Sequence, residues 1–545
     1  MKTNKIFKYT SFLFLSAAVL TACGDFEEIN TNKQGVSTQM AKGDGVSVGG
    51  FIQTLQRTVI PIGTAANSTD YINRYQTAYH LGQDTWSGYF AQNADWNSGR
   101  NHTTYYLMNS WIKDTYDRSY TDVFNPWLSI KNKATADTPQ DFALAQVLKI
   151  AAWHKTTDVF GPIPYTKAGM GLIVTPYDSQ EVVYKTMLQE LAEAVTTLTT
   201  FANNGGKLFT NYDLVYGGDA VRWVKFANSL MLRLAMRIRY ALPQEAQRYA
   251  ELAVNHSIGV MSDVKDGASI SLAQGLQFEN PIERFAGQYG ETRMGLPIFS
   301  YMAGYEDPRL PKYFLPSQSS YAIPLSFTSN SYLPLPPGLG VKGDEKNIRS
   351  IFYCSLPNIE RNTPIHWMRT SEVLFLRAEG ALVGWNMKAD AEVLYKQGIA
   401  MSFAENQVPE AALAQYINTE RQPTSVQFNI YPYRKNYQPA SQASVSFKGN
   451  QEEKLEKIMI QKWIALYPNG QEAWSEWRRT GYPRMQTVYR NNSNGLIDSE
   501  KGIRRMHYTI RESRSDEERK ALEEAVQLLG GPDEPSTKLW WDKKH

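Results

Sequence analysis

The first residue that could do chemistry is Cys23, which follows Leu20, Thr21 and Ala22. Small residues directly before a cysteine are what a lipoprotein signal peptidase requires at its cleavage site. A lipid on the Cys23 thiol would then tie the chain to a membrane, and several acyl chains would make that anchor stable. We therefore expect residues 1–22 to be removed as a signal peptide.

The segment before Cys23 has the composition of an export signal. Lys2, Lys5 and Lys8 give it a positive start, and an apolar run extends over residues 12–20. This run is too short to cross a bilayer core of about 30 Å, so it is not expected to persist as a transmembrane helix. The alternative is an ordinary secretory signal that happens to precede a cysteine.

Two glycine-rich segments have the spacing of enzyme motifs without the context that such motifs need. Residues 45–49 match the nucleophile elbow of hydrolases, but the preceding residues 39–44 are polar and contain glycine instead of forming a buried strand. Residues 338–343 match a dinucleotide-binding fingerprint, but they follow a proline run that cannot be a central parallel strand. Catalysis at Ser47 is not expected, and we interpret residues 338–343 as a loop.

No residue spacing points to a metal centre. The seven histidines are scattered, and neither a His-Glu-x-x-His motif nor paired cysteines occur. Acidic residues are plentiful, but a glycosidase needs two carboxylates about 5 to 9.5 Å apart in space, which counting does not reveal. We expect no catalytic residue and no cofactor, and we leave bound calcium open.

Composition narrows the class of protein further. Lipidation of Cys23 would leave Cys354, the second of two cysteines, without a disulfide partner. The net charge is only +3 and the sequence has no long basic run of the kind that binds nucleic acid, so we do not expect nucleic acid as a partner. The 32 tyrosines and 13 tryptophans exceed the needs of a core, and such rings also suit exposed stacking surfaces.

Helical periodicity dominates the elements that must position these residues. Apolar residues recur at spacings of three and four after Ser179 and again over residues 223–238. Thr138 and Pro139 are typical of a helix start. Further helices are predicted over residues 372–383, 391–403, 452–466 and 517–529.

Two long segments, about 259–354 and 407–450, lack such periodicity and are rich in Pro, Gly, Ser and Tyr. They predict loop-rich insertions with few short strands. Trp86, Tyr89 and Phe90 are spaced to share one helix face in the core. We therefore predict a mostly α-helical protein, in which helix pairs frame long irregular insertions and could stack as tetratricopeptide-like units.

Several segments, in this order along the chain, resemble the SusD/RagB family of outer-membrane nutrient-binding lipoproteins. Residues 25–30 (Asp-Phe-Glu-Glu-Ile-Asn) are similar to the start of one SusD-like subfamily. Residues 158–165 follow, and the most specific block is residues 223–235. The remaining blocks are residues 301–310, 378–385, 461–463, 472–474, 478–483 and 540–542.

The resemblance implies a SusD-like fold with a tetratricopeptide-like scaffold: a lipidated tether over residues 23–50 and a single domain over residues 51–545. It also implies that the protein captures an oligosaccharide, without a catalytic step, for a partner TonB-dependent transporter of the SusC type. The acidic residues 25, 27 and 28 are similar to the family's signal for delivery to the outer surface. The implied location is thus the cell surface, lipid-anchored in the outer membrane.

One loop is the first candidate for ligand contact. Residues 95–101 have turn composition and place Trp96 among side chains that form hydrogen bonds. Their position is similar to the family's loop that carries a binding Trp and Asn. The resemblance therefore implies that Trp96 and Asn97 bind the ligand with help from Arg100. The alternative is that Trp96 only packs this loop onto the scaffold.

Residues 283–290 are the second candidate, because the family also carries binding aromatic residues in this irregular region. Here the candidate residues are Phe285 and Tyr289. Three other functions stay open at this point: the same fold capturing peptides, a glycan hydrolase, and a purely structural lid without a ligand of its own.

Overall fold

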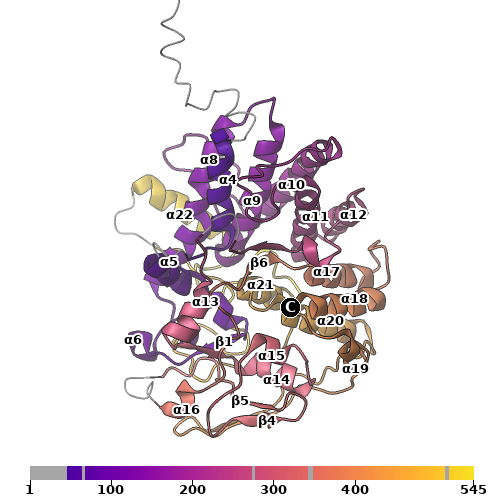
Figure 1. Ribbon diagram of the computed structural model, residues 1–545. Helices are drawn as coiled ribbons and strands as arrows, with labels where there is room; N and C mark the ends of the chain where they lie inside the picture. The colour runs from indigo at the N-terminus through magenta and orange to yellow at the C-terminus, as the bar shows by residue number, and fades with distance from the viewer. Residues whose placement is uncertain (1–45, 64–67, 273–276, 342–347, 510–514, 545) are drawn as a thin grey trace, which may run out of the picture.

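The computed structural model describes residues 46–63, 68–272, 277–341, 348–509 and 515–544. Most of the described chain is helical and its strands are short, which confirms the predicted fold class. In Figure 1 the long helices form an arc from α8 at the top through α10, α11 and α17 to α20. The lower part of the same view is rich in loops and short elements.

The first group of long helices packs in chain order. Helix α8 packs on α9, α9 on α10, α10 on α11 and α11 on α12, while α4 packs on both α8 and α9. The bounds are α4 (Val46–Val59), α8 (Asp122–Lys133), α9 (Pro139–Phe160), α10 (Gln180–Asn203), α11 (Ala220–Arg237) and α12 (Pro243–Asn255). Stacked helix pairs of this kind are the tetratricopeptide-like arrangement that was predicted.

A second group of helices continues the arc. Helix α17 packs on α18 and α20, α20 packs on α21, and α17 also contacts α11 of the first group. The bounds are α17 (Thr370–Leu382), α18 (Ala391–Glu405), α20 (Gln451–Leu466) and α21 (Gly470–Thr480). Helices α17, α18 and α20, together with α22 (Asp516–Leu529), confirm the four that periodicity predicts in the C-terminal half, with ends shifted by a few residues.

Local sequence explains where these helices begin. Pro139 is the first residue of α9, a position at which the missing N–H removes no helix hydrogen bond. The Ser179 hydroxyl accepts a hydrogen bond from the Val182 N–H (3.3 Å) at the start of α10. The apolar stripe of α10 is buried as its spacing predicts: Tyr184, Met187, Leu188, Leu191, Val195 and Leu198.

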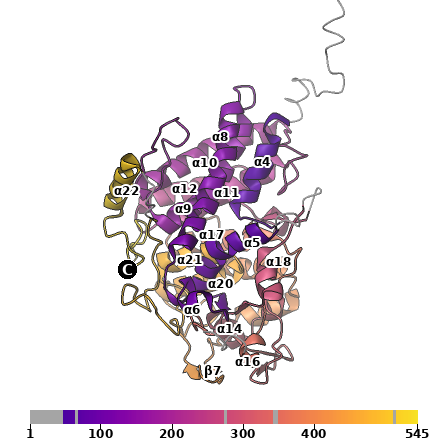
Figure 2. The same ribbon diagram turned by 90° about the vertical axis from the view of Figure 1, so that its left-hand side faces the viewer.

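Short helices fill the segments between the long ones. They are α5 (Ser68–Tyr75), η1 (Gln76–Asp84), α6 (Trp96–Gly99), η2 (His102–Thr104), α7 (Asn109–Tyr116), η3 (Asp117–Thr121), η4 (Val264–Asp266), α13 (Pro281–Glu283), η5 (Arg284–Gln288), α14 (Leu296–Gly304), α15 (Leu310–Tyr313), α16 (Arg349–Phe352), η7 (Glu410–Ala412) and α19 (Leu413–Ile417). Figure 2 faces the side on which α5, α6 and α16 lie.

The named strands of the described chain form antiparallel pairs. They are β1 (Phe90–Gln92) with β3 (Thr292–Met294), β2 (Ala268–Ile270) with β6 (Ile365–Met368), β4 (Ile323–Leu325) with β5 (Asn330–Tyr332), and β7 (Val426–Phe428) with β8 (Lys435–Tyr437). The first two pairs join residues far apart in the sequence, so they fasten the loop-rich insertion to the helical scaffold.

The structure corrects three expectations. Trp86, Tyr89 and Phe90 are buried, but they do not share a helix: the chain turns after Trp86 and enters β1 at Phe90. The insertion contains α14, a buried apolar helix whose uniform hydrophobicity gives no periodic signal. Helix α4 begins at Val46, within the expected tether, so residues 46–50 belong to the folded body.

A buried ion network connects the two helix groups. The Arg237 guanidinium of α11 bonds to the carboxylates of Glu472 (2.5 Å) and Glu476 (2.7 Å) in α21, and it lies 3.3 Å from Asp158 of α9. Arg233 makes two bonds of 2.7 Å to Glu372 of α17. Asp158, Arg233 and Glu472 lie in blocks that carry the family resemblance, and their burial gives them a structural role.

The described residues contain no helix that is long and apolar enough to cross a membrane. Cys354 is buried, and burial raises the pKa of its thiol to about 12. Cys23, the signal segment and residues 24–45 of the expected tether lie outside the described residues.

Candidate binding surface and an internal cavity

The β1–β3 ladder brings the two candidate loops together. Gln92 pairs with Thr292 at one end of the ladder, and the Asn93 N–H donates to the Glu291 carbonyl (3.0 Å) just beyond it. The first loop leaves the ladder at this end and reaches Trp96, while the second loop enters the ladder here from Tyr289. Residues almost 200 positions apart therefore start from the same point of the fold.

The Trp96 loop is held by several hydrogen bonds. The Asn101 amide donates to the Trp96 carbonyl (2.9 Å), and the Asn492 amide donates to the Gly99 carbonyl (3.0 Å). Gly99 has φ +74° and lies so close to the Gly340 backbone that a Cβ atom would come within 2.7 Å of its carbonyl oxygen. The loop is thus preorganised before any ligand binds.

The candidate side chains of this loop lie at the surface. Trp96 is partly exposed, and its ring meets the buried Trp111 edge-on at 6.4 Å. Asn97 is exposed with φ 51°, and its amide N–H donates to the Arg100 carbonyl (2.7 Å). The exposed Arg100 guanidinium lies 4.8 Å from the centre of the partly exposed Tyr106 ring. The loop therefore presents two aromatic rings beside polar side chains.

The second loop separates its two candidates. Tyr289 is partly exposed, and its hydroxyl donates to the exposed Asn73 amide oxygen (3.0 Å). Phe285 is fully buried and packs on Tyr75 at 6.1 Å and on His80 at 4.9 Å. A buried ring offers no face to a ligand, so we place Phe285 behind the surface, where it supports Tyr289 at 6.3 Å.

The structure adds an aromatic residue that sequence reasoning did not identify. Phe352 of α16 is 49% exposed, and its ring lies against Gly290, the residue after Tyr289. Two N–H groups of Arg293 in β3 donate to the Phe352 carbonyl (2.9 and 2.7 Å), which fixes its position beside the ladder. In Figure 1, α6, α13 and α16 lie along one side of the molecule. We call Trp96, Asn97, Arg100, Tyr289 and Phe352 the ladder-end surface.

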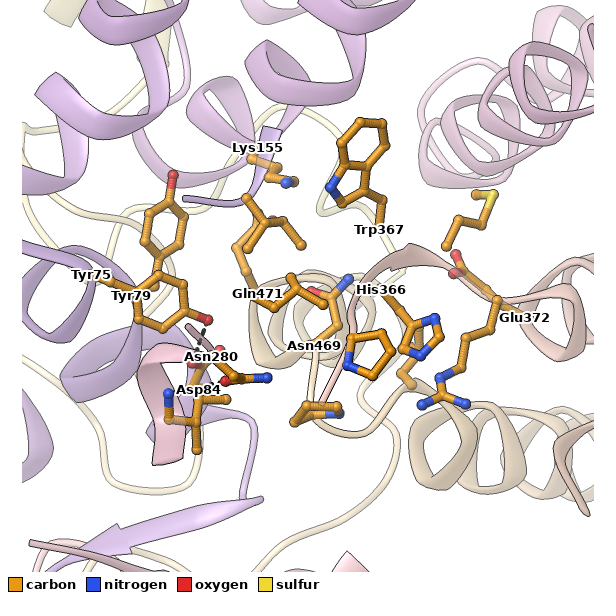
Figure 3. Close-up of a pocket in the computed structure, with 18 residues that line it drawn as sticks. Tyr75, Tyr79, Asp84, Lys155, Asn280, His366, Trp367, Glu372, Asn469 and Gln471 are labelled. Atoms are coloured by element: carbon orange, nitrogen blue, oxygen red, sulfur yellow. Dashed lines mark hydrogen bonds between the residues drawn. The ribbon is translucent and has the colours of Figure 1, made fainter. Parts of the chain in front are cut away.

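Behind this surface the chain forms a cavity of about 40 Å³ (Figure 3). Its wall includes Tyr75 of α5, Asp84 of η1, Lys155 of α9, Trp367 of β6 and Gln471 of α21. Tyr75 also packs on Phe285, so one residue separates the cavity from the base of the second loop. No sequence motif marks these residues, because they come from distant parts of the chain.

The described residues contain no group of three or more His, Cys, Asp or Glu side chains arranged to hold a metal ion. The dinucleotide-like segment is a loop over its described residues 338–341, where Gly338 (φ +63°) packs against the Thr103 carbonyl. The hydrolase-like segment leads into α4, so Ser47 lies in the first turn of a helix and not on a strand-to-helix elbow.

Comparison with known proteins gives consistent matches. The family model described as SusD-like, SusD and RagB outer membrane lipoprotein, matches residues 28–542. A chitin-binding SusD homologue from Flavobacterium johnsoniae is 35% identical with a TM-score of 0.83, covering 91% of this chain and 99% of that chain. A SusD homologue from Bacteroides vulgatus is 32% identical with a TM-score of 0.82, covering 92% of this chain and 99% of that one.

A third solved structure, a SusD homologue from Bacteroides thetaiotaomicron, is 31% identical with a TM-score of 0.80, covering 91% of this chain and 99% of that chain. No curated protein matched the chain. Thus both the family model and the solved structures cover nearly the whole length, including both helix groups and the loop-rich insertion.

Proposed function

The chain belongs to the SusD/RagB family of outer membrane lipoproteins, and on this basis we propose that it captures an oligosaccharide at the cell surface. The captured glycan passes to a partner TonB-dependent transporter of the SusC type, and the protein itself performs no catalytic step. A lipid on Cys23 anchors it in the outer membrane, facing outwards.

The ladder-end surface is the observation that carries this proposal. Trp96, Tyr289 and Phe352 expose aromatic faces, on which the apolar C–H face of a sugar ring can stack. Asn97 and Arg100 add hydrogen-bonding groups for sugar hydroxyls within the same loop. Because hydrogen bonds hold the Trp96 loop in place, binding costs little conformational entropy.

The description of the Flavobacterium johnsoniae relative as chitin-binding supports a glycan as the ligand class. The alternative within the same fold is capture of peptides, which aromatic loops could also serve. The two alternatives differ in what the surface recognises, and a binding experiment separates them.

The purified full-length protein in detergent should be tested on a glycan array and on a peptide library. We expect saturable binding to at least one oligosaccharide, and replacing Trp96 with alanine should abolish or strongly weaken it. Trp385, a partly exposed tryptophan on the turn after α17, provides the matched control, because α17 lies across the molecule from α6 in Figure 1. Binding to peptides with no glycan above background would contradict the proposal.

A further inference from the structure

Lys155 is a buried cation without an ion pair. It is 4% exposed, and its ammonium group donates to the Val59 carbonyl. In the described part of the chain no carboxylate lies within ion-pair distance of it. Lys149, six positions earlier on the same helix and 2% exposed, instead pairs with Glu190 at 2.8 Å. Since buried lysines are usually paired, a buried Lys155 without an ion pair needs a reason.

Two buried N–H donors line the same cavity and also lack a partner within the described ranges. They are the Trp367 indole N–H, on a side chain 2% exposed, and the Gln471 amide, on a side chain 3% exposed. Burying such a group without a hydrogen bond destabilises the folded state, because the group has lost its bonds to water. Figure 3 shows the nitrogen-bearing ends of Lys155 and Trp367 turned toward each other across the cavity.

The carboxylates in the cavity wall are already engaged. Glu372 accepts both of its short bonds from Arg233. Asp84 accepts from the Tyr75 hydroxyl (3.3 Å) and from the Gly470 N–H (3.2 Å), and burial raises its pKa, which favours the neutral form. Three further atoms of the wall lack a partner among the described residues, the Tyr79 hydroxyl, the Gln471 carbonyl oxygen and His366 Nδ1, and water can bond to each.

We propose that this cavity binds one small monovalent anion, a halide or a formate-sized carboxylate, between Lys155, Trp367 and Gln471. The anion supplies the missing charge for Lys155 and accepts the two N–H bonds. The volume of about 40 Å³ holds roughly three water-sized groups, so a sugar ring is excluded. This site is therefore separate from the ladder-end surface and goes beyond the proposed glycan capture.

The position of the site predicts what the anion does. Lys155 belongs to α9 in the first helix group, Gln471 to α21 in the second group, and Trp367 to β6, the strand between the loop-rich insertion and α17. An anion bonded to all three would connect these parts. Because it binds only the folded chain, it should raise the melting temperature in a saturable way.

The test uses the purified full-length protein at constant ionic strength, with sodium gluconate replaced stepwise by bromide or formate. Gluconate is too large for the cavity and serves as the reference. We expect a saturable rise in melting temperature, and whichever anion saturates at the lower concentration assigns the site to a halide or to a carboxylate. A crystal grown in bromide should give an anomalous peak between Lys155 and Trp367.

Variants tie the effect to this cavity. Lys155→Met should weaken the anion effect at least tenfold, while Lys149→Met on the same helix should leave it unchanged. If Lys155→Met does not fold by circular dichroism, Trp367→Phe, which removes one donor and keeps an aromatic ring, should weaken the effect instead. A thermal shift unchanged in both cavity variants, or a bromide crystal with only water in the cavity, would overturn the proposal.

Discussion

Arg479 of α21 and Glu379 of α17 form a two-bond ion pair in the interior, with distances of 2.7 and 2.6 Å between paired atoms. Both side chains are fully buried. Although burial opposes ionisation, Arg479 and Arg239 hold the pKa of Glu379 below its ordinary value. The pair thus stays charged inside the second helix group, where water cannot replace either partner.

Replacing Arg479 with methionine should destabilise the protein by about 3–5 kcal/mol, because the change leaves the Glu379 carboxylate buried without its principal partner. Urea unfolding followed by circular dichroism measures this loss. Arg248→Met is the control, since the Arg248–Glu245 pair on α12 has the same 2.7 Å contact but is 57% and 41% exposed. That change should cost less than about 1 kcal/mol. Equal losses in the two variants would contradict the structural role of the buried pair.

Trp96→Ala and Tyr289→Ala should each weaken glycan binding without a large loss of stability. A partly exposed ring that stacks on a sugar is expected to contribute about 2 kcal/mol, or roughly 30-fold in affinity. Isothermal titration with the glycan identified on the array measures the effect. Phe285→Leu should instead lower the free energy of unfolding more than it lowers glycan affinity, because Phe285 is fully buried. Full affinity in Trp96→Ala would show that this ring only packs the loop.

Gly99→Ala tests whether the shape of the Trp96 loop matters. An alanine here has an unfavourable positive φ and meets the Gly340 carbonyl, so the loop must move. Gly495→Ala is the matched control, because Gly495 has φ +87° but open space around it. Both variants should lose about 1–2 kcal/mol of stability from the backbone conformation. Only Gly99→Ala should also weaken glycan binding, and equal affinity in the two variants would argue against a preorganised loop.

The helical scaffold could be predicted because its signals are local. The stripes of α10 and α11 repeat every three to four residues, and Ser179 and Pro139 mark helix starts. The ladder-end surface could be predicted only in part. Trp96 follows from turn composition and family resemblance, but β1 and β3 have three residues each and lie 200 positions apart. No local pattern pairs such strands.

The sequence also could not predict which aromatic residue of the second candidate loop is buried and which is exposed. Phe285 and Tyr289 are four positions apart, yet the turn over η5 directs Phe285 to the core and leaves Tyr289 at the surface. Phe352 gives no signal of its own, because its neighbours are apolar and aromatic as well. Lys155 does give a signal in the sequence, because it lies in the long apolar helix α9, which is buried along most of its length. A lysine in such a helix indicates a paired or functional cation.

Cys23→Ala should remove the lipid anchor and release or mislocalise the protein, because the lipid on this residue is the proposed attachment to the membrane. Fractionation of cells and surface labelling measure the location. A serine substitution at Cys354 is the control for loss of a thiol, since this cysteine is buried in the folded body, away from the signal segment. Unchanged surface display of Cys23→Ala would contradict lipidation at this residue.

Lys155→Met should stabilise the protein more at pH 6 than at pH 10 when gluconate is the anion. Burial, and then Arg233, lower the pKa of Lys155 from 10.5 to about 7. Below pH 7 the folded and unfolded chains both carry this proton, so the cost of burying the ammonium group is fully present. Between pH 7 and 10.5 only the unfolded chain holds the proton, and the folded state gains up to about 1.4 kcal/mol per pH unit.

The methionine variant has no such proton, so its advantage over the parent protein should shrink as pH rises through that window. Urea unfolding at several pH values measures the difference. Lys185→Met, at an exposed lysine of α10, should show no comparable trend. Repeating the series in formate should reduce the advantage at pH 6, because an anion beside Lys155 compensates the buried charge. An advantage that stays constant from pH 6 to 10 would mean that Lys155 is not buried as a strained cation.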